Sequence, residues 1–252
     1  MTIRKRKNLK IRRHKRKNYV TLVILLLLLT LLTFYFVLFT DFFDISNVEV
    51  IDNKKVTSDE ILQKSRLKNG QSIFRFNKNQ VENIIEKIPY IKSASLVRVF
   101  PNTIKIYIEE REAIGAAFYE NQFIFVDSQN IILEVSDKLI DTNIPILTAI
   151  ENNLGAIVIG DELQIKPEWL KKELFNILNL LKERELLNHL SEVNITKENI
   201  FHLYTKGGSV IKVRNSDIVK EKLDFIRTYL LEKDERMIID LTHGGNPTYI
   251  PR

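Results

Sequence analysis

The chain has 252 residues, of which 44% are hydrophobic and 28% charged, a balance that excludes a largely disordered protein. It contains no cysteine, which excludes disulfides, thiolate metal sites and cysteine nucleophiles. The net charge of +6 is unevenly distributed, because ten of the 38 basic residues lie within residues 1–17. The first acidic residue is Asp41, so the chain from there onward carries 28 basic residues against 32 acidic ones and is mildly acidic.

An uncharged segment separates the basic tail, residues 1–18, from Asp41. Residues 19–39 are apolar almost throughout, and as a helix they would span about 31 Å, close to the roughly 30 Å hydrocarbon core of a bilayer. A cleaved signal peptide has a shorter apolar core and ends in a small-residue cleavage site, whereas this segment exits through FVLFTDFFD. We therefore predict an uncleaved transmembrane helix over residues 19–40.

The basic residues flank only the N-terminal side of this helix. The positive-inside rule then places the tail in the cytoplasm and residues 41–252 outside it. A Lys/Arg run is also typical of nucleic-acid binding, but topology accounts for this one and anionic lipid head groups lie next to it. We predict membrane lipids as the partner of the tail and no nucleic acid.

The pattern of residues 43–111 predicts the order β-α-α-β-β. Thr57 and Glu60 form a capping box at the start of the first helix, and Pro89 ends the second. The expected elements are a strand at 45–51, a helix from the capping box to Asn69-Gly70, a helix from Asn77 or Asn79, and two strands joined by a Pro101-Asn102 turn.

The run ASLVRVFPNTIKI at residues 94–106, followed by Glu110-Arg111-Glu112-Ala113, is similar to the strand–turn–strand signature of the FtsQ/DivIB family of bacterial cell-division proteins. Phe100 stands where that family more often has Trp. The β-α-α-β-β order directly after an anchor also resembles a POTRA domain. The resemblance implies a POTRA domain at residues 43–111 and an extracytoplasmic FtsQ/DivIB-type β domain at 112–252.

In residues 112–252 we expect a mostly antiparallel sheet, so that the fold class is α+β, with a transmembrane helix, the POTRA domain and a second mixed α/β domain. Asn130 suits a left-handed turn position and Gly207-Gly208 a hairpin tip. The expected strands are 116–119, 122–126, 131–135, 193–195, 200–204, 210–213 and 237–242, and the run IPILT at 144–148 resembles the family's Pro-x-Leu-Thr step. One helix begins at Pro167 and buries Leu170, Leu174, Ile177, Leu178 and Leu181, and a single last helix carries Val219, Leu223, Ile226 and Leu230.

Motifs of catalysis and metal binding are missing from the sequence. The four histidines lack the spacing of a zinc helix, and no nucleophile elbow, S-x-x-K pair or phosphate-binding loop occurs. We therefore expect no enzymatic activity, no catalytic residue, no metal and no cofactor. Two alternatives stay open, a membrane-anchored cell-wall enzyme and a POTRA-type secretion or assembly factor. The second would carry tandem POTRA repeats, and we find one.

The lack of these motifs favours a binding role, and an open sheet edge is the feature that binding would use. We expect an edge near the chain end, at residues 236–242 and 247–250, where a partner strand could add. The resemblance implies that this face captures division proteins of the FtsB/DivIC and FtsL type, with the septal penicillin-binding protein as a further partner, at the division septum. By position the candidates are Ile238, Asp240, Thr242 and Tyr249. The alternative that Ile238 is simply core stays open, and Tyr249 is the preferred contact.

Overall fold

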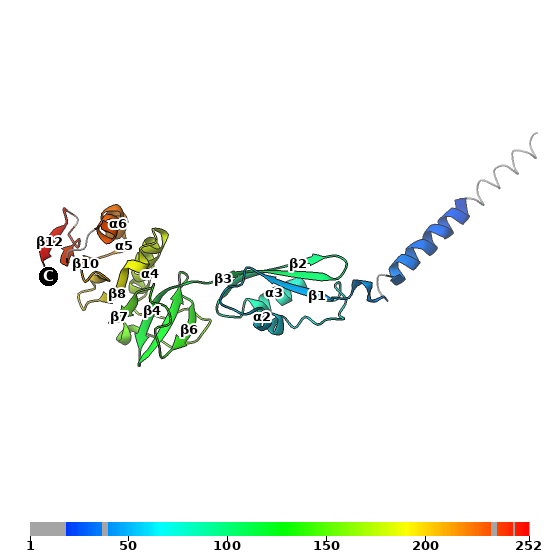
Figure 1. Cartoon of the computed structure of the whole chain (residues 1–252), viewed down its shortest axis with the longest axis horizontal. Helices are drawn as coiled ribbons and strands as arrows, with labels where there is room; N and C mark the ends of the chain where they lie inside the picture. Colours follow the sequence, from blue (N-terminus) through cyan, green and yellow to red (C-terminus); the bar gives the residue numbers. More distant parts are fainter. Residues whose placement is uncertain (1–18, 37–39, 233–235, 244, 252) are drawn as a thin grey trace, which may run out of the picture. The chain divides into compact units, whose positions relative to one another are not determined.

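The computed structural model describes residues 19–36, 40–232, 236–243 and 245–251 (Figure 1). The predicted basic tail and residues 37–39 of the predicted span lie outside the described residues. The chain divides into two compact units. The first comprises Met1–Asp52, Ser58–Glu82 and Ser95–Tyr107, and the second comprises Asn53–Thr57, Asn83–Ala94 and Ile108–Arg252.

One helix in the described part of the chain, Tyr19–Phe36, is long and apolar enough to cross a membrane. None of its apolar window is buried against the rest of the protein. Two threonine hydroxyls are hydrogen-bonded within the helix: that of Thr30 donates to the Leu27 carbonyl at 2.8 Å and that of Thr33 to the Leu29 carbonyl at 2.7 Å. The helix therefore has the length, the composition and the internal hydrogen bonding that a lipid environment requires.

The β-α-α-β-β order predicted for residues 43–111 is confirmed. After a short 3-10 turn, η1 (Asp41–Phe43), the elements are β1 (Asn47–Ile51), α2 (Ser58–Ser65), α3 (Lys78–Ile85), β2 (Ile91–Val99) and β3 (Thr103–Glu110). The three strands form one sheet in the order β1-β3-β2, with β1 parallel to β3. Ile104 and Ile106 of the central strand are fully buried, as their alternation predicts.

The first of these helices ends earlier than the sequence predicts. We expected α2 to run to Asn69-Gly70, but it ends at Ser65 because Arg66 adopts a left-handed φ of 59°. The Ser65 hydroxyl donates to the Leu62 carbonyl at 2.7 Å and accepts the Leu67 N–H at 3.2 Å, so a side chain satisfies the helix end.

Nine strands of the second unit form a single sheet. They are β4 (Ala113–Tyr119), β5 (Gln122–Asp127), β6 (Ile132–Ser136), β7 (Ile146–Thr148), β8 (Leu190–Ile195), β9 (Phe201–Thr205), β10 (Val210–Val213), β11 (Met237–Asp240) and β12 (Thr248–Pro251). Their order is β12-β11-β10-β9-β8-β7-β4-β5-β6. The sheet is mostly antiparallel, as predicted, but β7 lies parallel to both β4 and β8, and β10 lies parallel to β11. Two 3-10 turns, η2 (Glu151–Asn153) and η3 (Leu187–His189), complete the connections.

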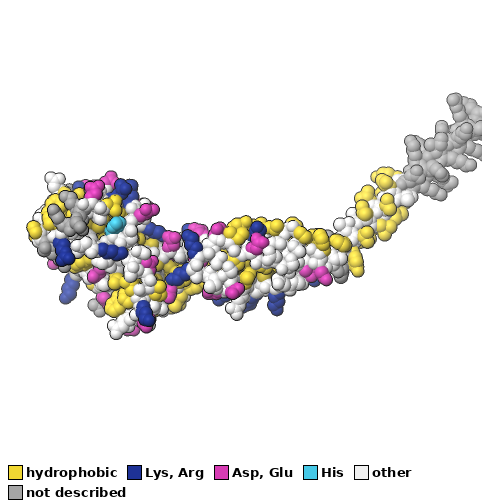
Figure 2. Space-filling view, viewed as in Figure 1, with side chains coloured by type: hydrophobic (Ala, Val, Ile, Leu, Met, Phe, Trp, Pro, Cys, Tyr) yellow, Lys and Arg dark blue, Asp and Glu magenta, His cyan; other side chains and the backbone are white. Residues whose placement is uncertain are grey.

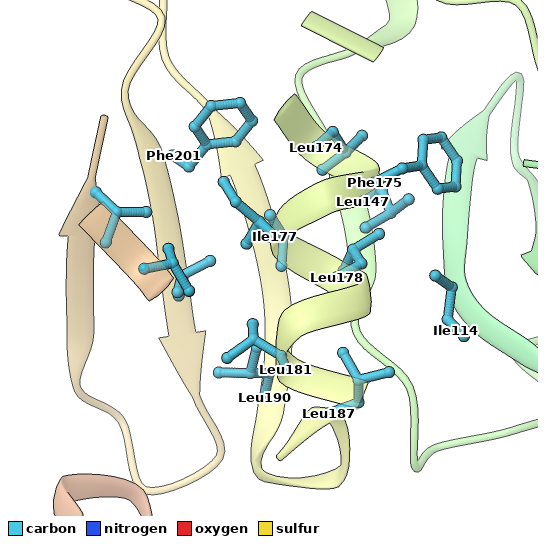
Figure 3. Close-up of a cluster of buried hydrophobic side chains, with 14 of the residues drawn as sticks. Ile114, Leu147, Leu174, Phe175, Ile177, Leu178, Leu181, Leu187, Leu190 and Phe201 are labelled. Atoms are coloured by element: carbon cyan, nitrogen blue, oxygen red, sulfur yellow. The ribbon is translucent and has the colours of Figure 1, made fainter. Parts of the chain in front are cut away.

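The core of the second unit lies between this sheet and α4 (Glu168–Glu183), which begins directly after Pro167 as predicted (Figure 3). All five predicted core residues of α4 are buried: Leu170, Leu174, Ile177, Leu178 and Leu181. They meet side chains from strands across the sheet, among them Leu147 of β7, Val193 of β8 and Leu203 of β9. One helix face therefore holds strands from both halves of the sheet together.

The expected single last helix is wrong, because it is two helices, α5 (Ser216–Glu221) and α6 (Leu223–Glu232). Lys222 between them leaves helical geometry, with φ −99° and ψ 15°. The interruption shifts the phase of the second helix by about one residue. Tyr229, 5% exposed, consequently completes its buried face in place of the predicted Leu230, which is half-buried.

Several residues of the strand–turn–strand signature brace the chain internally. The Glu110 carboxylate accepts three consecutive backbone N–H groups, from Lys54 and Val56 at 2.9 Å each and from Lys55 at 2.8 Å. Arg111 forms a 2.6 Å ion pair with Asp127, a side chain only 3% exposed. Asp127 in turn accepts the N–H groups that close the turn before β6, where the predicted left-handed Asn130 has φ 68°.

The packing of α4 predicts a large loss of stability on truncation. Leu178→Ala removes a fully buried side chain and should lower the free energy of unfolding by about 2–5 kcal/mol. Leu231→Ala, on the helix α6 and 51% exposed, is the matched control and should change it by less than about 1 kcal/mol. Equal effects in urea titrations of the two variants would contradict the assignment of the core.

The Glu110 brace predicts an acid-sensitive contribution to stability. Partial burial acts to raise the pKa of Glu110, but the three N–H groups outweigh it and hold the pKa below its ordinary 4.5. The folded state therefore binds fewer protons than the unfolded state near that pH, and the stabilisation is complete above pH 4.5 and is lost as the pH falls through the folded pKa.

Glu110→Gln should accordingly lower stability by about 1–2 kcal/mol at neutral pH, because the amide cannot replace the charged acceptor. Urea titrations between pH 3 and pH 7 should also show a flatter acid limb than those of the native chain. A variant that keeps the full acid dependence would exclude Glu110 as its source.

Candidate functional site

β12 is the strand at one end of the nine-stranded sheet, and it pairs with β11 alone. All four of its residues are exposed, with Tyr249 at 47% and Ile250 at 52%. We expected the edge at residues 236–242 and their continuation at 247–250. The structure places it on the continuation, which folds back over β11, so that β11 lies one strand inside the edge.

The direction of the main-chain groups of β11 follows from its bonds on the β10 side. The N–H of Leu241, directly after the strand, donates to the Lys212 carbonyl at 2.9 Å, and that of Met237 donates to the Ser209 hydroxyl at 3.1 Å. Peptide groups alternate along a strand, so odd-numbered residues face β10 and even-numbered residues face β12.

The register pairs each even-numbered residue of β11 with an even-numbered residue of β12. The odd-numbered residues of β12, Tyr249 and Pro251, therefore direct their main-chain groups away from the sheet. The open edge thus offers the N–H and carbonyl of Tyr249 and the carbonyl of Pro251. Proline suits this position because it has no N–H to leave unpaired.

The four candidate residues do not form one patch. Ile239, fully buried, faces the core, and its register partner Tyr249 lies on the same face, with its ring 6.2 Å from that of Phe225. Ile238 and Asp240 alternate with Ile239 and so lie on the opposite face of the sheet. Tyr249 is consequently separated from two of the other candidates by the thickness of the sheet.

Thr242 is a hydrogen-bond donor to Asp240 and is not part of the exposed surface. Its N–H and its hydroxyl both donate to one Asp240 carboxylate oxygen, at 2.8 and 2.6 Å, and the residue is 8% exposed. Partial burial acts to raise the pKa of Asp240, but the two bonds from Thr242 outweigh it and hold that pKa below its ordinary value. The pair closes the end of β11, and Thr242 offers little surface to a partner.

The sheet face opposite α4 carries polar side chains on the central strands β9, β8 and β7. His202 and Tyr204 of β9 lie side by side with ring centroids 6.2 Å apart, and burial together with the charge of Lys212 lowers the pKa of His202. Thr148 and Glu192 are hydrogen-bonded to each other on the same side of the sheet. Within the described ranges, no group of three or more His, Asp or Glu side chains is placed to hold a metal ion.

The sequence analysis placed Ile250 in the expected edge without naming it as a contact, and it missed Pro251. Ile250 pairs with Ile238 on the polar face, and Pro251 supplies an outward carbonyl. The available signal was the alternation of a short strand that ends in proline, a residue confined in sheets to edges and bulges. The candidate site is therefore the outer side of β12, with Tyr249 on one face and Ile250 on the other.

Comparison with known proteins agrees with this architecture. The family model of the FtsQ-type POTRA domain matches residues 43–111. The chain is 29% identical over 214 residues to the cell division protein DivIB of Clostridium acetobutylicum, covering 82% of this chain and 83% of that one. It is also 29% identical to DivIB of Clostridium tetani, covering 82% of this chain and 78% of that one.

A relative with the other family name is the cell division protein FtsQ of Syntrophotalea carbinolica, 26% identical over 73% of this chain and 64% of that one. The solved major extracytoplasmic domain of DivIB from Geobacillus stearothermophilus is 13% identical, with a TM-score of 0.30, over 49% of this chain and 96% of that one. The sequence matches together place an FtsQ-type POTRA domain after an apolar N-terminal helix and extend over most of the chain. The chain belongs to the FtsQ/DivIB family of cell-division proteins.

Proposed function

We propose that this chain is a non-enzymatic scaffold of the division complex, which binds partner membrane proteins outside the cytoplasmic membrane. The observation that carries the proposal is the open outer side of β12. The functional organisation that we propose is a cytoplasmic tail at 1–18, a transmembrane helix at 19–40, a POTRA domain at 43–111 and a β domain at 112–252.

The mode of binding that the edge supports is strand addition. A partner strand aligned with β12 would bond to the outward N–H and carbonyl of Tyr249 and to the carbonyl of Pro251. Its alternate side chains would then lie on the two faces of the sheet, one set beside Tyr249 and the other beside Ile250. This explains why candidate residues on opposite faces can serve one partner.

The partners that fit are division proteins of the FtsB/DivIC and FtsL type, together with the septal penicillin-binding protein at the septum. Within this proposal Tyr249 makes direct contact, Ile238 and Asp240 pair with β12 and support the edge, and Thr242 acts only through Asp240.

Anchoring raises the effective concentration of such partners. The basic tail lies in the cytoplasm and contacts anionic lipid, and the apolar helix holds both extracytoplasmic domains close to the membrane. Confinement to one membrane converts a weak strand contact into stable capture, because the second binding event becomes intramolecular. A short edge of four residues is therefore sufficient for the role.

The proposal predicts that partner capture depends on a backbone group. Tyr249→Pro removes the one outward N–H and should weaken binding to the DivIC-type protein of the same organism by about tenfold, because a buried interfacial carbonyl then lacks its donor. The measurement is a titration of the full-length chain in nanodiscs with the purified partner. Tyr249→Lys should also weaken binding, through loss of the ring.

Tyr249→Val is the matched control, since it keeps the N–H and the strand propensity but removes the ring. It should bind more tightly than Tyr249→Pro. Equal affinity of the Pro variant and the native chain, with unchanged unfolding, would exclude strand addition at β12.

A further inference from the structure

Four phenylalanines of the first unit cluster after the apolar helix, at the start of the β-α-α-β-β region. Phe42 and Phe43 belong to η1, Phe74 lies between α2 and α3, and Phe100 lies at the β2–β3 turn. Adjacent rings of this aromatic cluster are 5.0 to 6.5 Å apart, and those of Phe74 and Phe100 are stacked at 5.5 Å.

Three of these four rings are largely open to solvent. Phe42 is 54% exposed, Phe74 44% and Phe100 58%. Figure 2 shows hydrophobic side chains on the surface of the first unit and on the apolar helix. Contiguous exposed apolar surface of this kind marks an interaction site, because single exposed rings are common in soluble proteins but stacked groups are not.

The aromatic cluster is held in place by the backbone. The Phe43 carbonyl accepts the Ile73 N–H at 2.9 Å, and the Ser46 N–H donates to the Asn102 carbonyl at 2.9 Å. The entry segment is therefore bonded both to the loop that carries Phe74 and to the turn that carries Phe100. The three exposed rings stand as one rigid group, and they lose little conformational entropy on contact with a surface.

The short distance between the end of the apolar helix and the aromatic cluster identifies that surface. The helix Tyr19–Phe36 rises about 27 Å at 1.5 Å per residue, so a hydrocarbon core of about 30 Å that it crosses ends close to Phe36. The rings of Phe36 and Phe42 lie 5.8 Å apart, so the aromatic cluster begins beside the last residue of the helix. The head-group layer on each side is about 5–8 Å thick, so the aromatic cluster lies within or directly against it.

We propose that the aromatic cluster inserts its exposed rings into the interfacial layer of the outer leaflet and seats the β-α-α-β-β region on the membrane. Aromatic rings favour this layer, where one side is apolar and the other wet. Asp41 begins η1, Asp44 follows it and Arg75 follows Phe74, so charges of both signs lie beside the cluster, and the contact that we propose is partition of the rings rather than attraction to anionic head groups. The ligand is therefore the lipid interface itself, recognised by ring partition, and zwitterionic phosphatidylcholine suffices.

This inference rests on the proposed membrane anchoring, and its test separates the two. Trp169 is the one tryptophan of the chain, so Trp169→Phe gives a background without tryptophan fluorescence. Single tryptophans are then introduced by Phe100→Trp in the cluster, Phe34→Trp in the apolar helix and Tyr107→Trp on β3. Tyr107 is the matched control, because it is a surface aromatic of the same unit, 39% exposed, four residues along the strand from its start at Thr103.

Each full-length variant is placed in phosphatidylcholine nanodiscs with plain or brominated acyl chains, and the loss of tryptophan emission is measured. We expect strong loss at positions 34 and 100, a blue shift at position 100 relative to position 107, and little loss at position 107. Raising the salt concentration should leave the loss at position 100 unchanged, because the contact is apolar.

Loss at position 34 without loss at position 100 would overturn the seating while leaving the anchor in place, and a protein partner would then be the occupant of the rings. Equal loss at positions 100 and 107 would overturn it too, since the surface would then adsorb without specificity. Absence of loss at position 34 would instead refute the anchoring on which the inference rests.

Discussion

Burial of the apolar face of α4 against the sheet is the interaction on which the second unit depends. Leu174, Ile177, Leu178 and Leu181 pack on strands from both halves of the sheet and are fully buried. Because α4 and the two short helices contribute to one core, one sheet face is closed and the opposite face stays polar around His202. The strand order of this sheet ends in β6 at one side and in β12 at the other, and β12 is the edge strand at the chain end.

The residues of the strand–turn–strand signature stabilise the fold and are not part of the proposed binding edge at β12. Glu110 closes the loop between β1 and α2 through three N–H groups, and Arg111 pairs with the buried Asp127. Arg98 donates to the carbonyls of Ile73 and Phe76, which fixes the loop beside the aromatic cluster. These residues determine how the chain is braced, whereas the proposed binding surface uses main-chain groups: the N–H and carbonyl of Tyr249 and the carbonyl of Pro251.

Local patterns in the sequence were sufficient for most elements. The alternation of Ile104, Ile106 and Ile108 and the helical spacing of the leucines after Pro167 each follow from period and burial. The left-handed position of Asn130 follows from turn chemistry. The break at Lys222 and the early end of α2 at Arg66 depend on tertiary packing and single backbone dihedrals, which periodicity does not encode.

The edge was only partly predictable for a related reason. The position of Ile238, Asp240 and Tyr249 in the sequence was enough to predict that they lie near the sheet edge. Their separation on the two faces of the sheet depends on the register of β11 against β12, which the sequence does not reveal. The same holds for the parallel insertion of β7, whose three residues pair between two strands distant in the sequence. Long-range pairing of short strands leaves little trace in local composition.

The central claim, that β12 receives a partner strand, is tested most directly by photo-crosslinking in living cells. A photoreactive amino acid at Tyr249 and at Ile250 reports on the two faces of the edge, and one at Ile140, 53% exposed against 52% for Ile250, is the control for exposure alone. The account predicts crosslinks to one DivIC-type partner from both edge positions and none from Ile140. Crosslinks to that partner from Ile140, with none from either edge position, would contradict it.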